Sequence, residues 1–131
     1  MRKTGLLHPA LTEAITAMGH TETLAVADAG LPVPPGVERI DLALVPGVPG
    51  FLETARAILS ELQVEAAACA EEMKEKNPGV LEELRKLLGD IPLRFIPHEE
   101  FKALTASARC VVRTGECSPY ANVLFMAGVT F

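Results

Sequence analysis

The sequence predicts an α/β fold, a three-layer sandwich in which helices flank a mixed, mostly parallel sheet of about six strands. Short apolar runs typical of buried strands alternate with stretches whose apolar residues recur at helical spacing. Glycine and proline separate the two kinds of segment. The length of 131 residues and the apolar fraction of 49% suffice for one core. We therefore expect residues 1–131 to form a single domain.

The first predicted elements are a helix and two strands. The helix begins at Pro9, which suits the first helical position, and ends before Gly19. An apolar run predicts a buried strand over 24–27, and a second strand is predicted over 39–45. Between them, residues 30–36 include three prolines, which remove backbone donors and predict an ordered surface loop.

The alternation continues through the rest of the chain. A helix is predicted over 51–62. Residues 64–73 are rich in alanine, which favours a helix, but a return to the sheet directly after the preceding helix favours a strand, and we predict a strand. Asn77 as N-cap and Pro78 at the first position begin a helix that Gly89 ends. The remaining predicted elements are a strand over 93–96, a helix over 99–106, and strands over 109–113 and 123–127.

Charge and composition exclude several classes of function. The net charge of −5 and the pI near 5.2 argue against a surface for nucleic acid or anionic membrane. The N-terminus lacks the apolar core of a signal peptide, and no apolar stretch reaches membrane-spanning length, so a cytoplasmic location is expected. The three cysteines have no C-x-x-C spacing, which predicts reduced thiols. The absence of phosphate-loop, dinucleotide and metal-ligand motifs predicts no cofactor and no metal.

Two ionisable side chains flank the predicted strand over 24–27. Asp28 follows the strand directly, at the position where open α/β sheets bind ligands. His20 precedes the strand, just after Gly19, so we expect a loop to carry it. Each has an ordinary structural explanation as well, since a histidine after a helix often caps carbonyls and an aspartate before Ala-Gly often makes an Asx turn.

A second candidate stretch, residues 114–122, collects hydrogen-bonding side chains between the last two predicted strands. It contains Tyr120, the one tyrosine of the chain, and Asn122. An aromatic ring beside an amide suits a sugar, because the ring covers C–H faces while the amide pairs with hydroxyls. A β-turn with proline at its second position explains the same residues equally well.

Six segments together resemble the ribose and fucose mutarotase family over nearly the full length of the chain. They are MGHTETL (18–24), DAGLP (28–32), RIDLAL (39–44), QVEAA (63–67), HEEFK (98–102) and GECSPYAN (115–122). The fucose branch is similar in Gly-His, Asp-Ala and Tyr-x-Asn but lacks the DAGLP and ECSPYAN forms, which favours ribose. The segment between Leu88 and Ile91 is short for the family and touches no matched motif.

The resemblance implies an enzyme that interconverts the pyranose and furanose forms of D-ribose, from β-D-ribopyranose to β-D-ribofuranose, without a cofactor. It implies that His20 is the proton donor, although whether Asp28 holds this imidazole or only binds sugar stays open. His98, by itself, fits an exposed residue at a helix start. The residues implied to contact the sugar are Asp28, His98, Tyr120, Ala121 and Asn122.

The resemblance also implies a cytoplasmic homo-oligomer, a decamer of two pentameric rings with sites near subunit boundaries. The apolar tail over 123–131 is consistent with partial cover of a neighbouring subunit. No nucleic-acid or membrane partner is expected.

Three alternatives remain open at the level of the sequence. A non-catalytic sugar-binding regulatory module would keep the sugar-contacting side chains but would not depend on His20. A thiol enzyme would use Cys117 with His20 or His98, although nothing around Cys117 indicates an activated thiol. Within the family, fucose or another sugar is the alternative substrate.

Overall fold

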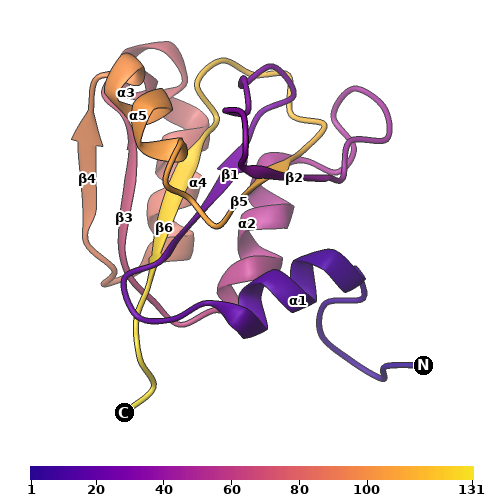
Figure 1. Ribbon diagram of the computed structural model, residues 1–131. Helices are drawn as coiled ribbons and strands as arrows, with labels where there is room; N and C mark the ends of the chain where they lie inside the picture. Colours follow the sequence, from indigo (N-terminus) through magenta and orange to yellow (C-terminus); the bar gives the residue numbers. More distant parts are fainter.

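The computed structural model describes residues 1–131 and contains one mixed sheet of six strands with five α-helices (Figure 1). The order across the sheet is β2-β5-β1-β6-β3-β4. All neighbouring strands are parallel except the two pairs that β6 makes with β1 and β3, which confirms the predicted mixed, mostly parallel sheet. The helices are α1 (Pro9–Ala17), α2 (Phe51–Leu59), α3 (Met73–Lys76), α4 (Pro78–Leu88) and α5 (His98–Thr105), and the strands are β1 (Thr23–Ala27), β2 (Glu38–Asp41), β3 (Val64–Ala70), β4 (Leu93–Ile96), β5 (Cys110–Arg113) and β6 (Val123–Ala127).

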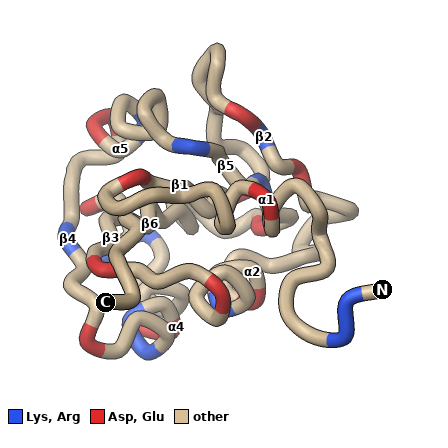
Figure 2. The backbone as a smooth tube through the Cα atoms, turned by 60° about the horizontal axis from the view of Figure 1, so that its bottom comes forward, with Lys and Arg blue, Asp and Glu red and all other residues tan.

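Alternation along each strand sorts the side chains into two cores, one on each face of the sheet. Leu24 and Val26 of β1 belong to the larger core, which α1, α2 and α4 complete, whereas Ala25 belongs to the smaller core. On that second face α5 packs its fully buried Phe101 against the small side chains of the strands. Figure 2 shows α5 on one side of the sheet and α2 and α4 on the other, which gives the three predicted layers.

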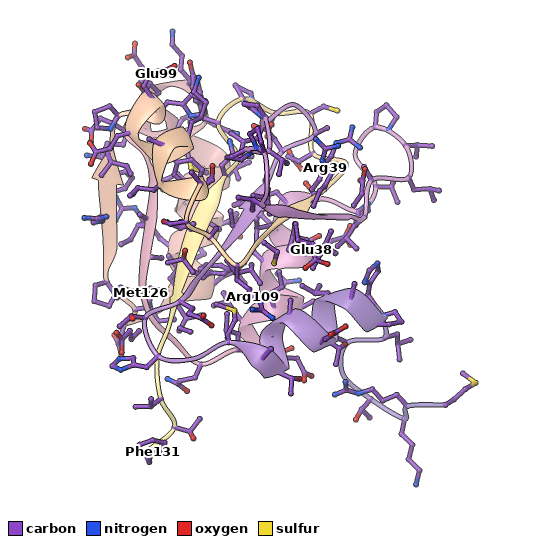
Figure 3. All side chains as sticks on the ribbon, in the orientation of Figure 1. Glu38, Arg39, Glu99, Arg109, Met126 and Phe131 are labelled. Carbon is purple, nitrogen blue, oxygen red and sulfur yellow. The ribbon has the colours of Figure 1, made fainter.

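Five of the six strands run in one direction, so their carboxyl ends lie along one edge, here named the carboxyl edge. The loop into β6 lies at the same edge because β6 runs the opposite way. The other edge, here named the amino edge, holds the loop into β1 and the tail after β6. Figure 3 shows this separation, with Glu99 of α5 at one end of the molecule and Met126 of β6 toward the other.

The predicted strand over 39–45 is too long, because β2 ends at Asp41. The Asp41 carboxylate receives two hydrogen bonds from Arg113 Nη1, at 3.1 and 3.0 Å, and its Oδ1 also accepts from Ala43 N at 3.0 Å. This Asx-type turn directs the chain away from the sheet. Residues 44–48 then form a tight turn closed by a bridge between Val45 and Val48, and Leu44 is left 77% exposed.

The sequence prediction also errs around β3, whereas the strand predicted over 123–127 is confirmed. The strand predicted over 64–73 ends at Ala70. Helix α3 follows, and its first residue, Met73, is fully buried. Asn77 stands at the N-cap of α4, but its side chain makes no capping bond. Within the apolar tail, residues 123–127 are the central strand β6, and only the last four residues leave the sheet. None of the helices combines the length and apolar character needed to cross a membrane.

Candidate functional site

The carboxyl edge gathers four of the predicted site residues around a shallow pocket of about 330 Å³. Asp28 follows β1, His98 begins α5 directly after β4, and Tyr120 lies in the loop before β6. These three side chains line the pocket, and Asn122 lies behind Asp28. Strands that are distant in the sequence therefore bring the predicted sugar-binding residues together.

Asp28 and Asn122 form a reciprocal pair. Asn122 Oδ1 accepts from the Asp28 backbone N at 2.9 Å, and Asn122 Nδ2 donates to Asp28 Oδ2 at 2.8 Å. Asp28 Oδ1 also accepts from Gly30 N at 2.9 Å, so the predicted Asx turn is present as well. Because a carboxylate has about four acceptor positions, Asp28 keeps capacity for ligand hydroxyls. Asn122 is fully buried, which makes it the rigid support of this carboxylate.

His98 and Tyr120 form the aromatic wall of the pocket. Their rings meet edge to face, with centroids 5.0 Å apart and an interplanar angle of 85°. His98 Nδ1 is buried and has no hydrogen-bond partner within the chain. A buried polar atom without a partner is costly, so a ligand group that pairs with it would gain binding energy. Glu72 Oε2 accepts from the His98 backbone N at 2.9 Å and fixes the start of α5.

The loop that carries Tyr120 is held from two sides. Asn77 Nδ2 donates to Ser118 Oγ and to the Pro119 carbonyl, each at 2.9 Å. Glu116 accepts from Phe51 N at 3.2 Å and so ties the loop to the start of α2. Tyr120 itself has a φ of 56°, a left-handed conformation that is uncommon for residues other than glycine. Such outliers concentrate at functional sites.

Ala121 contributes no exposed side chain to the pocket. Its methyl group is fully buried in the larger core. The whole residue, backbone included, is 0% exposed, so Ala121 does not line the pocket.

His20 lies at the amino edge, away from the pocket. The five residues of β1 between the two regions span roughly 17 Å. The partner of His20 Nε2 is Glu65 Oε2 at 2.9 Å, and both side chains are partly exposed, at 52% and 37%. Asp28 therefore does not orient His20 within one chain.

The cysteines show no sign of catalytic chemistry. Burial raises the pKa of the Cys69 and Cys110 thiols to about 12. Cys117 is exposed, and the hydrogen bond of its Sγ goes to the Gly115 carbonyl at 3.4 Å rather than to an imidazole. The arrangement that activates a thiol, a base within hydrogen-bond reach, is missing here. No group of three or more His, Cys, Asp and Glu side chains is placed to hold a metal ion.

Comparison with known proteins identifies the family of this chain. The model of the RbsD / FucU transport protein family matches residues 1–130. The chain belongs to this family. Among its relatives, the D-ribose pyranase of Symbiobacterium thermophilum is 56% identical over 131 residues and that of Coprothermobacter proteolyticus is 55% identical, each match covering 100% of both chains.

Two solved structures agree with the fold. The structure of Bacillus subtilis RbsD complexed with D-ribose matches with a TM-score of 0.97 at 44% identity and covers 100% of both chains. The fucose mutarotase of Streptococcus pneumoniae, solved with L-fucose, matches with a TM-score of 0.83 at 22% identity over 95% of each chain, which shows the shared fold alone.

Sequence reasoning missed the residues that support the site. Glu72 and Asn77 lie in the stretch where a strand was predicted to end and a helix to be capped, and neither has a local pattern that points to the carboxyl edge. Glu65 lies within the QVEAA motif, which gave a signal of family membership but no role. Their contacts join residues 26 to 45 positions apart.

Proposed function

We propose that this chain has D-ribose pyranase activity and interconverts the pyranose and furanose forms of D-ribose. The full-length relatives with that name and the likeness to RbsD complexed with D-ribose support the substrate. The observation that carries the proposal is the preorganised pair of Asp28 and Asn122 beside the unpaired nitrogen of His98. A fixed carboxylate, an aromatic wall and a free imidazole nitrogen suit a small molecule rich in hydroxyl groups.

The reaction needs only proton transfers. In ring opening, the anomeric hydroxyl loses a proton, the bond from C1 to the ring oxygen breaks, and the ring oxygen gains a proton. In ring closure, the C4 hydroxyl adds to the aldehyde instead of the C5 hydroxyl, and the same transfers run in reverse. An imidazole that titrates near neutral pH can give and take these protons, and general acid–base catalysis contributes roughly 100- to 10,000-fold.

We assign His20 as the proton donor and the carboxyl-edge residues as the sugar-binding groups. Asp28 would accept from sugar hydroxyls, and the Tyr120 ring would cover a C–H face. His98 Nδ1 would pair with a further hydroxyl, and Ala121 would act by fixing the chain between Tyr120 and Asn122. Asn122 would act by holding Asp28 in place.

The distance between the edges supports the proposal of a site shared by two chains. His20 reaches no carboxyl-edge residue of its own chain, so we propose that the His20 of an adjacent copy completes the site in a homo-oligomer, as in the expected decamer of two pentamers. Each edge exposes apolar side chains that association would cover: Leu44 in the turn next to the site loop, and the fully exposed Phe131 beyond β6. A head-to-tail contact of unlike surfaces generates a ring when its rotation closes.

The three unpaired cysteines fit a reducing compartment, and we propose a cytoplasmic location.

Exchange spectroscopy by NMR tests the activity directly. Wild-type protein should accelerate exchange between the ribopyranose and ribofuranose signals of D-ribose more than it accelerates exchange of L-fucose. Faster exchange for fucose alone would make fucose the substrate. Ribose binding without any acceleration would favour the non-catalytic sugar-binding module.

A further inference from the structure

Three independent features of the amino edge converge on the His20 ring. The first is the backbone of Thr21, which has a φ of 70° although β-branched residues strongly disfavour the left-handed region. The conformation is held by the bond from Thr21 N to the Ala127 carbonyl at 2.9 Å and by the bond from Gly19 N to Glu22 Oε2 at 2.8 Å. The loop is therefore fixed in a disfavoured shape that directs His20 toward β3.

The second feature is the irregularity of β3 at Glu65. Val64 pairs with Ala127 of β6 and Ala66 pairs with Met126, so Glu65 is the extra residue where the register shifts. A bulge of this kind re-aims a side chain, and bulges are common next to active sites. Here the displaced residue is the one whose carboxylate meets His20 Nε2 at 2.9 Å.

The third feature is the glycine at position 128. A Cβ at Gly128 would lie 3.0 Å from Glu65 Cβ and 3.2 Å from Glu65 Oε2, closer than ordinary packing allows. The missing side chain therefore leaves the Glu65 carboxylate the room that it occupies beside His20 Nε2.

We propose that Glu65 is a positioning residue that fixes the tautomer and the direction of the His20 ring; this inference rests on the proposed function. A carboxylate only accepts hydrogen bonds, so the Glu65 contact keeps a hydrogen on His20 Nε2 and leaves Nδ1 as the nitrogen that exchanges a proton with the sugar. A carboxylate on the far nitrogen also stabilises the imidazolium that forms during transfer.

Four variants test this role. Glu65→Ala removes the acceptor, and Glu65→Gln keeps an acceptor oxygen but no charge. Gly128→Ala displaces the Glu65 carboxylate while leaving it in the chain. Glu83→Ala is the matched control, because Glu83 forms an exposed ion pair with Lys86 on α4, outside both edges.

Turnover and ring tautomer are measured together on the intact oligomer. In wild type, the ¹⁵N correlation spectrum of the neutral His20 ring should show the hydrogen on Nε2. Glu65→Ala should give mixed tautomers and lower kcat by about tenfold or more with KM changed less than about twofold, because misplacement of a catalytic group costs rate more than binding. Glu65→Gln and Gly128→Ala should give smaller losses, and Glu83→Ala none.

The outcomes separate this inference from the proposed function. Unchanged kcat in Glu65→Ala, or an unchanged ring spectrum, would overturn the positioning role and leave ribose exchange by the wild type intact. If the wild type failed to accelerate ribose exchange, the proposed function would be wrong. The ring spectrum would still show whether Glu65 orients the His20 ring.

Discussion

Asn122 and Asp28, which are 94 positions apart in the sequence, hold each other through two hydrogen bonds at the carboxyl edge. One bond fixes the Asp28 backbone at the end of β1, and the other fixes one oxygen of its carboxylate. Since Asn122 is fully buried behind Asp28, it sets the direction in which Asp28 presents its remaining lone pairs to the pocket.

Asn122→Ala should therefore weaken both the fold and ribose binding. The Asp28 N–H would lose its acceptor, and a buried donor left without a partner costs about 1–3 kcal/mol. Urea denaturation should show a loss of that size in the free energy of unfolding, and calorimetry should show weaker ribose affinity. Lost affinity with an unchanged free energy of unfolding would show instead that Asn122 acts only by direct contact with the sugar.

Asn77→Ala should affect binding more than turnover. Its side chain holds Ser118 and the Pro119 carbonyl, directly before Tyr120, so its loss should loosen the loop that forms the aromatic wall. We expect KM for ribose to rise severalfold while kcat stays nearly constant. Glu75→Ala, an exposed carboxylate of the neighbouring helix α3, is the control and should leave both constants unchanged. A fall in kcat with constant KM would argue against this role.

Thiol labelling should distinguish the three cysteines. Cys117 is exposed, whereas the raised pKa of the Cys69 and Cys110 thiols, about 12, keeps them protonated and unreactive at neutral pH. Mass spectrometry should find one alkylated cysteine in the native protein and three after unfolding. Cys117→Ser should retain ribose exchange, and a complete loss of exchange with affinity intact would restore the thiol enzyme as the better explanation.

The elements that the sequence predicted well are those with strong local signals. The helices that begin at Pro9 and Pro78 and the strand over 93–96 appear where apolar spacing and turn residues place them. The strand over 39–45 was overextended because its apolar residues continue past the turn that Asp41 and Arg113 impose. An ion pair between residues 72 positions apart leaves no trace in a local pattern.

The candidate site was predictable residue by residue but not as an arrangement. Local reasoning isolated His20, Asp28, Tyr120 and Asn122, and the family resemblance added His98. Which of these side chains come into contact depends on the fold. His20 and Asp28 are close in the sequence, but strand β1 lies between them and places them at opposite edges of the sheet. The contact between Glu65 and His20 likewise depends on a bulge in β3, for which the sequence has no recognisable local pattern.

His20→Ala and Asp28→Asn should separate proton transfer from binding. Loss of a proton donor removes an interaction made in the transition state, so His20→Ala should lower kcat by roughly 100-fold or more with ribose affinity nearly unchanged. Asp28→Asn replaces an acceptor by a donor, so it should chiefly weaken affinity. Calorimetry and exchange spectroscopy on each variant measure the two effects, and near wild-type exchange by His20→Ala would refute its assignment.

Mixed oligomers of these two variants test most directly whether the carboxyl edge of one chain and the amino edge of an adjacent chain act on one sugar. At a ribose concentration far below the KM of the Asp28→Asn variant, each variant alone should be nearly inactive in ribose exchange, His20→Ala because proton transfer is lost and Asp28→Asn because little sugar is bound. When the two are coexpressed and assemble at random, about one boundary in four should combine an intact Asp28 edge with an intact His20, because each partner is suitable half of the time. We expect exchange at about a quarter of the wild-type rate in the mixture. Exchange no greater than that of the separate variants, in oligomers shown by mass spectrometry to be mixed, would contradict the shared site.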